Sequence, residues 1–183
     1  MKQGNAENNE AAKKITEKPG RLKRWAREAL LMVVIFITAS IAIDLWRGQT
    51  MPDGTMPEMV VSTLQGEIID VKALSHEQPV MIYFWATWCS ICRFVSPTVN
   101  WMSDDYAVVS VALSSGENAR IAGYMEHHGY DFRTANDNDG LIARQWGISA
   151  TPTLVIVKNG QVVSSTTGIS TPPGIWLRMQ LAK

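Results

Sequence analysis

The sequence predicts an α/β domain, because short apolar runs typical of buried strands alternate with segments of helical periodicity. Residues 80–85 and 107–113 are two strongly apolar runs of strand length, and a segment with apolar positions spaced in threes and fours follows the first of them. Strand, helix, strand and helix in succession imply parallel pairing. The 183 residues, 46% of them hydrophobic, are enough for one packed domain with appendages.

The elements before and between these runs have recognisable turn and cap residues. Residues 60–64 and 68–71 predict a hairpin in which Gly66 supplies the turn. Ser114 and Glu117 have the spacing of a capping box, which predicts a helix that continues to about His128.

The last third of the chain predicts a closing hairpin and a final helix. A brief strand near Phe132 and a short helix that ends at Gly147 come first. The remaining predicted elements are two strands joined through Lys158-Asn159-Gly160 and one helix, at residues 153–157, 161–165 and 171–181.

Cys89 and Cys92 are the only cysteines of the chain, and they stand directly after the buried strand 80–85. The periodicity of Phe94, Val95, Val99, Trp101 and Met102 predicts a helix with one buried face, whose N-terminus lies at Cys89. Unpaired N–H groups and the helix dipole stabilise a thiolate at that position. Cys92 lies one turn further on, so it is expected to be more buried and to act as the resolving thiol.

Two other segments accompany the cysteine pair. Pro152 stands just before an apolar run and makes a cis peptide bond accessible, which would turn the backbone of Thr151 outward toward a partner peptide. Trp85 is expected to pack in the core, whereas Trp88, next to Cys89, is expected on the exposed rim of the site.

The segment Trp85-Ala86-Thr87-Trp88-Cys89-Ser90-Ile91-Cys92 resembles the thioredoxin active-site signature, and Thr151-Pro152-Thr153 resembles the cis-proline loop of that family. The resemblance covers about residues 59–181. It implies a thioredoxin fold, with a central mixed β-sheet flanked by helices. Within the superfamily the chain is most similar to membrane-tethered thiol-disulfide oxidoreductases of the suppressor for copper sensitivity D type, through Pro97, residues 136–140 and residues 174–178.

This resemblance implies particular roles for the site residues. Cys89 and Cys92 would be catalytic and form a redox-active disulfide, with no further cofactor and no metal. Trp88, Thr151 and Pro152 would bind substrate.

Two positions depart from related proteins. Thioredoxin has a buried carboxylate where this chain has Tyr83, so a buried proton acceptor is missing or comes from another residue. Relatives that reduce apocytochrome c usually carry an acidic residue where this chain has Val95, so the resemblance does not support a role in cytochrome maturation.

The N-terminal segment predicts a membrane anchor. Residues 1–28 carry eight Lys or Arg and four Glu, are poor in apolar residues and predict a disordered cytoplasmic tail. Residues 29–43 are uncharged, and with flanking residues up to 46 they predict a transmembrane signal-anchor, with seven basic residues just before it that keep the N-terminus inside. A cleaved signal peptide and a core helix are the alternatives.

Residues 47–58 then read as a linker, and residues 59–183 as the thioredoxin-like domain on the periplasmic side of the bacterial inner membrane. Met51, Met56 and Met59, in and next to the linker, carry thioethers that are soft ligands for Cu(I), but ordinary linker or domain-edge residues are the favoured interpretation. His127 and His128 are expected to stabilise a helix C-terminus, and His76 is expected in a loop.

Three hypotheses compete for the cysteine pair: redox catalysis, a copper-binding C-x-x-C module in copper tolerance, and an inert structural disulfide. The setting of the pair between a strand and a helix favours redox catalysis. By resemblance, a membrane thiol-disulfide hub would donate electrons, and periplasmic disulfide-bonded proteins would be the clients. No basic patch or phosphate-binding loop occurs in the folded part, so nucleic acid is not an expected partner.

The two residues between the cysteines predict the direction of electron flow. Ser90 offers one neutral hydrogen bond, and Ile91 brings no charge and shields the sulfur from water. The helix terminus is therefore the main stabiliser of the thiolate. The expected reduction potential lies nearer the thioredoxin end, about −270 mV, than the strong-oxidant end, about −120 mV.

Overall fold

The computed structural model describes residues 25, 27–32, 34–35 and 54–183 of a chain that divides into two compact units, residues 1–46 and 47–183. In the first unit, the described residues are helical. None of the helices formed by described residues combines the length and apolar character that crossing a membrane requires. The predicted tail, membrane span and first part of the linker lie largely outside the described residues, so they stay predictions.

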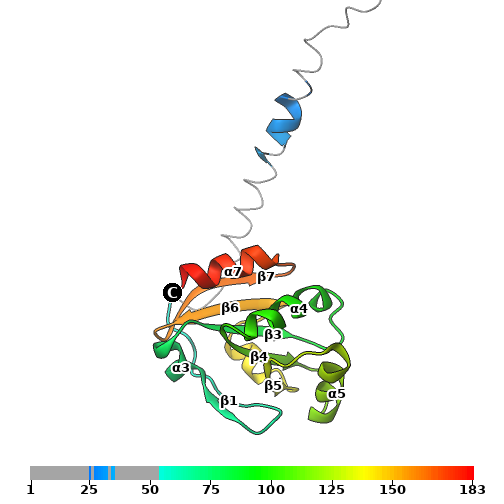
Figure 1. Ribbon diagram of the computed structural model, residues 1–183, viewed down its shortest axis with the longest axis vertical. Helices are drawn as coiled ribbons and strands as arrows, with labels where there is room; N and C mark the ends of the chain where they lie inside the picture. The colour runs from blue at the N-terminus through cyan, green and yellow to red at the C-terminus, as the bar shows by residue number, and fades with distance from the viewer. Residues whose placement is uncertain (1–24, 26, 33, 36–53) are drawn as a thin grey trace, which may run out of the picture. The chain divides into compact units, whose positions relative to one another are not determined.

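A five-stranded mixed sheet forms the centre of the second unit, with its strands in the order β5-β4-β3-β6-β7 (Figure 1). β3 pairs in parallel with β4, and β4 with β5, whereas β6 is antiparallel to both β3 and β7. The parallel pairing and the closing hairpin are thus as predicted. The strands are β3 (Val80–Trp85), β4 (Ala107–Leu113), β5 (Arg133–Asp137), β6 (Thr153–Lys158) and β7 (Gln161–Thr167).

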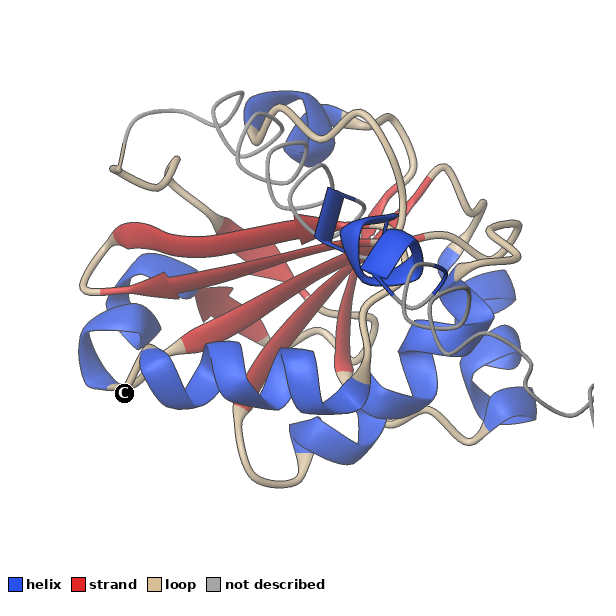
Figure 2. Cartoon of the chain, turned by 90° about the horizontal axis from the view of Figure 1, so that it is seen from above, coloured by secondary structure: helices blue, strands red, loops and turns tan. Residues whose placement is uncertain are grey.

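Helices lie on both sides of this sheet (Figure 2). They are α3 (Val71–Glu77), α4 (Cys92–Ser103), α5 (Asn118–His128), α6 (Leu141–Gln145) and α7 (Pro172–Leu181). A separate antiparallel hairpin, β1 (Val60–Ser62) and β2 (Ile68–Asp70), turns through Gly66, whose φ of 84° favours glycine. This arrangement is the predicted thioredoxin-like α/β fold.

The core has two halves, one on each face of the sheet, because successive residues of a strand point to opposite faces. Alternate residues of β3 belong to the half that packs against α4, α5 and α7: Met81, Tyr83 and Trp85. The residues between them belong to the half that packs against β1, β2 and α3: Val80, Ile82 and Phe84. All six side chains are fully buried, which explains why the strand reads as one continuous apolar run.

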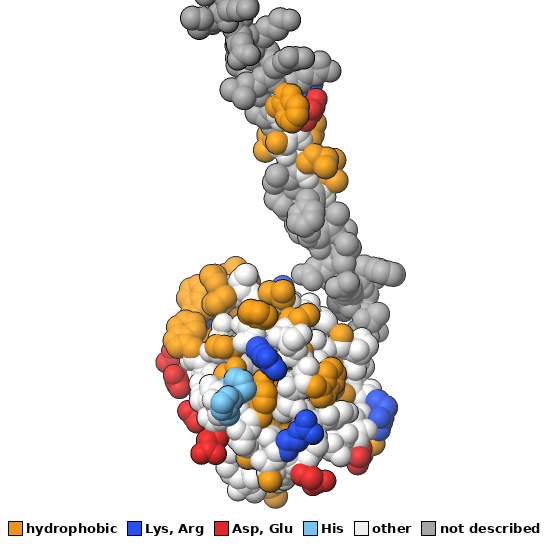
Figure 3. Space-filling model, turned by 90° about the vertical axis from the view of Figure 1, so that its right-hand side faces the viewer, with side chains coloured by type: hydrophobic (Ala, Val, Ile, Leu, Met, Phe, Trp, Pro, Cys, Tyr) orange, Lys and Arg blue, Asp and Glu red, His pale blue; other side chains and the backbone are white. Residues whose placement is uncertain are grey.

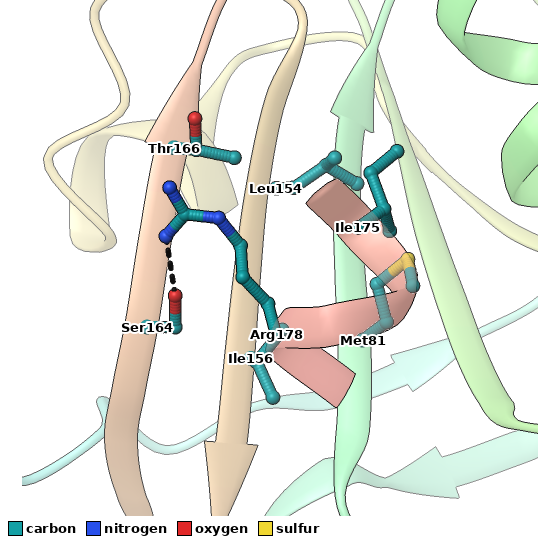
Figure 4. Close-up of a pocket in the computed structure, with 7 residues that line it drawn as sticks. All are labelled: Met81, Leu154, Ile156, Ser164, Thr166, Ile175 and Arg178. Carbon is teal, nitrogen blue, oxygen red and sulfur yellow. Dashed lines mark hydrogen bonds between the residues drawn. The ribbon is translucent and has the colours of Figure 1, made fainter. Parts of the chain in front are cut away.

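Helix α7 closes the sheet on the side of β6 and β7. Arg178 of this helix donates a hydrogen bond to the Ser164 hydroxyl at 2.9 Å (Figure 4). The two residues border a small cavity whose other lining side chains are mostly aliphatic: Met81, Leu154, Ile156, Thr166 and Ile175. Neither cysteine lines it, so its lining reflects the packing of α7.

Residues 54–58 belong to the folded domain, which corrects their assignment to the linker. Thr55 forms a β-bridge with Gln161, and the Val162 N–H donates to the Gly54 carbonyl oxygen at 2.8 Å. The Met56 side chain is buried in the core. The polar and glycine-rich composition of this segment concealed that it packs against the start of β7.

Two other expectations about local structure were wrong. Helix α3, which the sequence analysis missed, follows β2 without a loop, because the Asp70 carboxylate accepts a hydrogen bond from the Ala73 N–H at 3.0 Å. His76 therefore lies in the last turn of a helix and not in a loop. On α4, the side chains of Phe94 and Trp101 are exposed, although their spacing suggested a buried face.

Candidate active site

The cysteine pair lies where β3 leaves the sheet and α4 begins. Cys89 follows the end of β3 by four residues, and Cys92 is the first residue of α4. The two form a disulfide with their Cα atoms 5.3 Å apart. The predicted strand and helix are thus confirmed, but the helix begins at Cys92 and not at Cys89, because Ser90 and Ile91 form a turn before it.

The two cysteines differ in their surroundings. Cys89 keeps 6% of its surface exposed, whereas Cys92 is fully buried. The Cys92 N–H donates to the Cys89 sulfur at 3.1 Å. Because this N–H is one of the unpaired donors at the start of α4, it favours negative charge on Cys89 once the disulfide is reduced. Cys89 is therefore suited to be the attacking thiolate, and Cys92 the thiol behind it.

Trp88 is 63% exposed, and Trp85 is buried, both as expected. The Trp88 indole N–H donates to the Ser114 carbonyl oxygen at 3.0 Å, and the Thr87 N–H donates to the Ser115 hydroxyl oxygen at 3.0 Å. The segment after β4 thus anchors the active-site turn through these two hydrogen bonds. Sequence reasoning missed this role of Ser114 and Ser115.

The capping box predicted for this segment was wrong. Glu117 itself is the N-cap residue of α5 and makes no side-chain cap hydrogen bond. Ser114 instead has a φ of 43° and belongs to the turn that contacts Trp88. Asn138 anchors this turn by accepting from the Gly116 N–H at 3.2 Å, and Asn136 donates to the Gly116 carbonyl oxygen at 2.9 Å.

Pro152 lies at the edge of the same site. The Thr151–Pro152 peptide bond is cis. Thr153 is the β6 partner of Phe84, so Pro152 lies beside the end of β3, from which the cysteine turn departs. The sheet register thus brings residues that are about 60 positions apart in sequence to one end of β3.

Tyr83 lies beneath the cysteine pair, on the α4 side of β3. Its hydroxyl is 2.9 Å from the Ser96 hydroxyl and 3.5 Å from the Cys92 carbonyl oxygen. Burial raises the pKa of Tyr83 well above its ordinary value, and the hydrogen bond to Ser96 acts in the opposite direction. Sequence reasoning singled out Tyr83 but missed Ser96, which lies one turn after Cys92.

The histidines stand apart from the cysteines in the contacts that they make. The His128 ring contacts the Tyr124 carbonyl oxygen through Nδ1 at 2.8 Å, in the last turn of α5, as predicted for a helix C-terminus. Histidine side chains are seen beside hydrophobic surface on the face shown in Figure 3. Within residues 54–183 and the described part of the first unit, no group of three or more His, Cys, Asp or Glu could hold a metal ion.

Comparison with known proteins agrees with this geometry. The sequence matches the AhpC/TSA family over residues 48–165. It is 33% identical over 164 residues to a thioredoxin-like protein of Haemophilus influenzae, which spans 89% of this chain and 98% of the relative. It is 31% identical over 115 residues to a thiol:disulfide interchange protein DsbE homolog of Paracoccus denitrificans, over 61% of this chain and 64% of that protein.

Solved structures share the fold at lower identity. StoA from Bacillus subtilis is 20% identical, with a TM-score of 0.59 over 67% of this chain and 96% of that chain. A secreted thiol-disulfide isomerase from Corynebacterium glutamicum is 16% identical, with a TM-score of 0.61 over 68% of this chain and 82% of the other. The chain therefore belongs to the AhpC/TSA family. Because its relatives are thioredoxin-like and Cys89 and Cys92 form a disulfide, it is a thiol-disulfide oxidoreductase.

Proposed function

We propose that this protein is a membrane-anchored periplasmic reductant that passes electrons from a membrane thiol-disulfide hub to disulfide-bonded client proteins. The observation that carries the reductase mechanism is the contrast between the cysteines, with the Cys92 N–H directed at the Cys89 sulfur and Cys92 fully buried. The cluster of basic residues before residue 29 supports the anchor and its orientation.

In the proposed reaction, the Cys89 thiolate attacks one sulfur of a client disulfide. A mixed disulfide forms, and the other client sulfur leaves as a thiolate that takes up a proton. Cys92 then loses its proton and attacks the Cys89 sulfur, which releases the second client thiolate and forms the Cys89–Cys92 disulfide. Two electrons pass to the client, and the hub would return the pair to the dithiol state.

Trp88, Thr151 and Pro152 are proposed to bind the client. Trp88 is exposed beside Cys89, and its indole is held by the Ser114 carbonyl. Pro152 lies beside the end of β3, and Thr151 precedes it just before the start of β6 and is half-buried. An extended client segment placed between them would bring its disulfide to Cys89.

Trapping of mixed disulfides in the full-length, membrane-inserted protein tests this order of attack. Cys92→Ala should accumulate mixed disulfides with partners through Cys89, because the resolving thiol is gone. Cys89→Ala is the matched control and should trap few or none. More abundant trapping by Cys89→Ala than by Cys92→Ala would reverse the assignment.

The alternative is a copper-binding C-x-x-C module, and equilibration with glutathione buffers separates it from a reductant. A reductant should move between dithiol and disulfide over a potential range near that of thioredoxin. A metal module should instead bind Cu(I) stoichiometrically and show no turnover with a disulfide substrate.

Protease treatment of spheroplasts tests the anchor. Protease outside intact spheroplasts should digest the domain and leave the N-terminal tail protected. Recovery of a domain that begins near residue 43 would instead establish a cleaved signal peptide.

A further inference from the structure

Helix α7 has an outer face that carries no charge. The exposed residues of this helix are all apolar: Pro172, Pro173, Trp176, Leu177 and Leu181. Trp176, Leu177 and Leu181 keep 44%, 52% and 80% of their surface exposed. Within residues 54–183, every other helix exposes at least one charged side chain. Because the outer face of a surface helix is normally polar, the outer face of α7 is suited to an apolar partner.

The two polar side chains of α7 are bound to the domain and leave this face uninterrupted. Arg178 donates a hydrogen bond to the Ser164 hydroxyl on β7 at 2.9 Å, on the side where α7 lies along β6 and β7 (Figure 1). Gln180 donates to the Tyr106 hydroxyl at 3.0 Å, after the end of α4. The apolar face between these two contacts is therefore a feature of the folded domain.

The end of α7 lies beside the turn that receives the start of the domain. Lys158, at the end of β6, donates through Nζ to the carbonyl oxygen of Lys183, just after α7. At the same turn, the Met56 N–H donates to the Gly160 carbonyl oxygen at 3.0 Å. The chain thus enters the folded domain at the turn that also contacts the end of α7.

The stretch between the predicted membrane segment and the domain is short. Seven residues, 47–53, separate the end of that segment from Gly54. Even a fully extended chain of this length spans at most about 25 Å. A domain of the size of residues 54–183 has a diameter of about 35 Å. The anchor would therefore keep the surface around the turn, and with it the end of α7, near the lipid at a high effective concentration.

The position of α7 in the sheet argues against a client or a second copy as the occupant of this face. Val157, next to Lys158, pairs with Val80 at the start of β3, whereas the cysteines follow the end of β3. A client segment at Cys89 is thus remote from Leu181. The exposed side chains of one ten-residue helix also fall short of the roughly 800 Å² per partner that a stable dimer buries.

We propose that the outer face of α7, formed by Trp176, Leu177 and Leu181, rests on the phospholipid surface of the membrane that holds the anchor. The proposal rests on the membrane anchor of the proposed function. Tryptophan favours the membrane–water interface, and a helix with one apolar face lies in that interface with this face buried. The contact restricts rotation of the domain on its short tether, so Cys89 is presented at a constant height above the membrane.

Lipid quenching in the full-length protein tests this contact. The protein carries Leu177→Cys with a bimane label, and Cys89 and Cys92 are replaced by serine. It is inserted into vesicles of phosphatidylethanolamine and phosphatidylglycerol, in which part of the lipid carries a nitroxide near the headgroup. The label at position 177 should lose most of its fluorescence in these vesicles. The same label on Glu126→Cys, an exposed position on α5, is the matched control and should keep its fluorescence.

Substitutions on the apolar face sharpen the test. Leu181→Glu, at the most exposed of the three positions, should restore the fluorescence of the label at position 177, with an unchanged circular dichroism spectrum. Val163→Glu is the control, because Val163 is an exposed apolar residue of β7 whose neighbour Ser164 is the one that faces α7. Quenching that persists in Leu181→Glu would overturn the proposal.

Two other results separate the remaining explanations. A label that is shielded from water in vesicles but not quenched by the nitroxide lipid would assign the face to a second copy and overturn the lipid contact. Release of the protein from the vesicles by alkaline carbonate would contradict the anchor itself, and the lipid contact with it. Quenching in a protein that resists this extraction supports both.

Discussion

The two faces of β3 bury side chains equally well, but the polar side chains that β3 and β4 themselves bury all lie on one of them. On the face of Val80, Ile82 and Phe84, the core partners are aliphatic and aromatic residues such as Val109 and Val155. On the opposite face, Trp85 donates its indole N–H to the Ser110 hydroxyl at 3.0 Å.

Hydroxyl groups continue through this second face. The Ser110 hydroxyl oxygen lies 2.8 Å from the Thr134 hydroxyl oxygen, and the Tyr83 hydroxyl oxygen lies 2.9 Å from the Ser96 hydroxyl oxygen. The cysteines belong to the same half of the core. One face of β3 and β4 therefore presents only hydrophobic side chains, whereas the other carries buried polar groups, each of which needs a partner, in the half of the core that holds the reactive pair.

The largest change in stability is expected on the face of β3 that carries Val80, Ile82 and Phe84. Phe84→Ala should lower the free energy of unfolding by about 3–5 kcal/mol, because it leaves a cavity next to Trp146. Denaturant unfolding monitored by circular dichroism measures this change. Phe94→Ala is the control, since Phe94 is 77% exposed and its truncation should change stability by less than about 0.5 kcal/mol. Equal losses in the two variants would contradict the assignment of the core.

A smaller change in stability is expected from a hydroxyl group on the opposite face of the sheet, which carries Tyr83 and Trp85. Ser110→Ala should lower the free energy of unfolding by about 1–3 kcal/mol, because the buried Trp85 indole N–H loses its acceptor. Replacing both partners, as Trp85→Phe with Ser110→Ala, should be less than additive. Additive losses in a double-mutant cycle would show that the hydrogen bond contributes nothing.

Alkaline pH should destabilise the domain through the same face. Burial raises the pKa of Tyr83 above the ordinary value of 10.0, so the unfolded chain loses this proton at a pH where the folded chain keeps it. The contribution of Tyr83 is therefore fully present below pH about 10 and declines by about 1.4 kcal/mol per pH unit above it.

Unfolding curves between neutral and alkaline pH measure this slope. Tyr83→Phe should reduce it, whereas Tyr106→Phe, on the loop after α4, should not. An unchanged slope in Tyr83→Phe would show that another group causes the alkaline loss of stability.

The smallest effect is expected on the reduction potential, from a residue in the turn between Cys89 and Cys92. Ile91→His places between the cysteines a side chain that can carry a positive charge and donate a hydrogen bond. This side chain would stabilise the Cys89 thiolate and thereby raise the reduction potential. A rise of about 30 mV corresponds to about 1.4 kcal/mol. Equilibration with glutathione measures it, and Ile91→Leu is the matched control because it keeps the residue apolar. A wild-type potential above about −160 mV would already contradict the predicted reductant.

Sequence patterns predicted the parts of the fold that depend on local chemistry. The apolar runs identified β3, β4 and β6, and the Asn159-Gly160 turn identified the closing hairpin, in agreement with positive φ values at both residues. The strand before the cysteines and the helix after them placed the pair at the junction of these two elements, although α4 begins at Cys92 and not at Cys89.

Features that depend on contacts between distant residues were missed. Ser96 reads as an ordinary helix residue, and only the folded structure brings it to Tyr83. Ser114 has a capping spacing in sequence, but its backbone forms a left-handed turn that contacts Trp88. Periodicity also could not separate the buried Val95 and Val99 from the exposed Phe94, because apolar spacing does not reveal which face of a helix has a partner.

The segments before β3 have a consequence for how the protein behaves at high concentration. The edge strands of an open sheet can pair with a second molecule and start aggregation. Here Thr55 pairs with Gln161 at the β7 edge, and Thr63 pairs with Ala135 at the β5 edge. Both outer strands are thus partly blocked by the same chain, and a shortened protein that begins at Met59 would leave the start of β7 open to intermolecular strand addition.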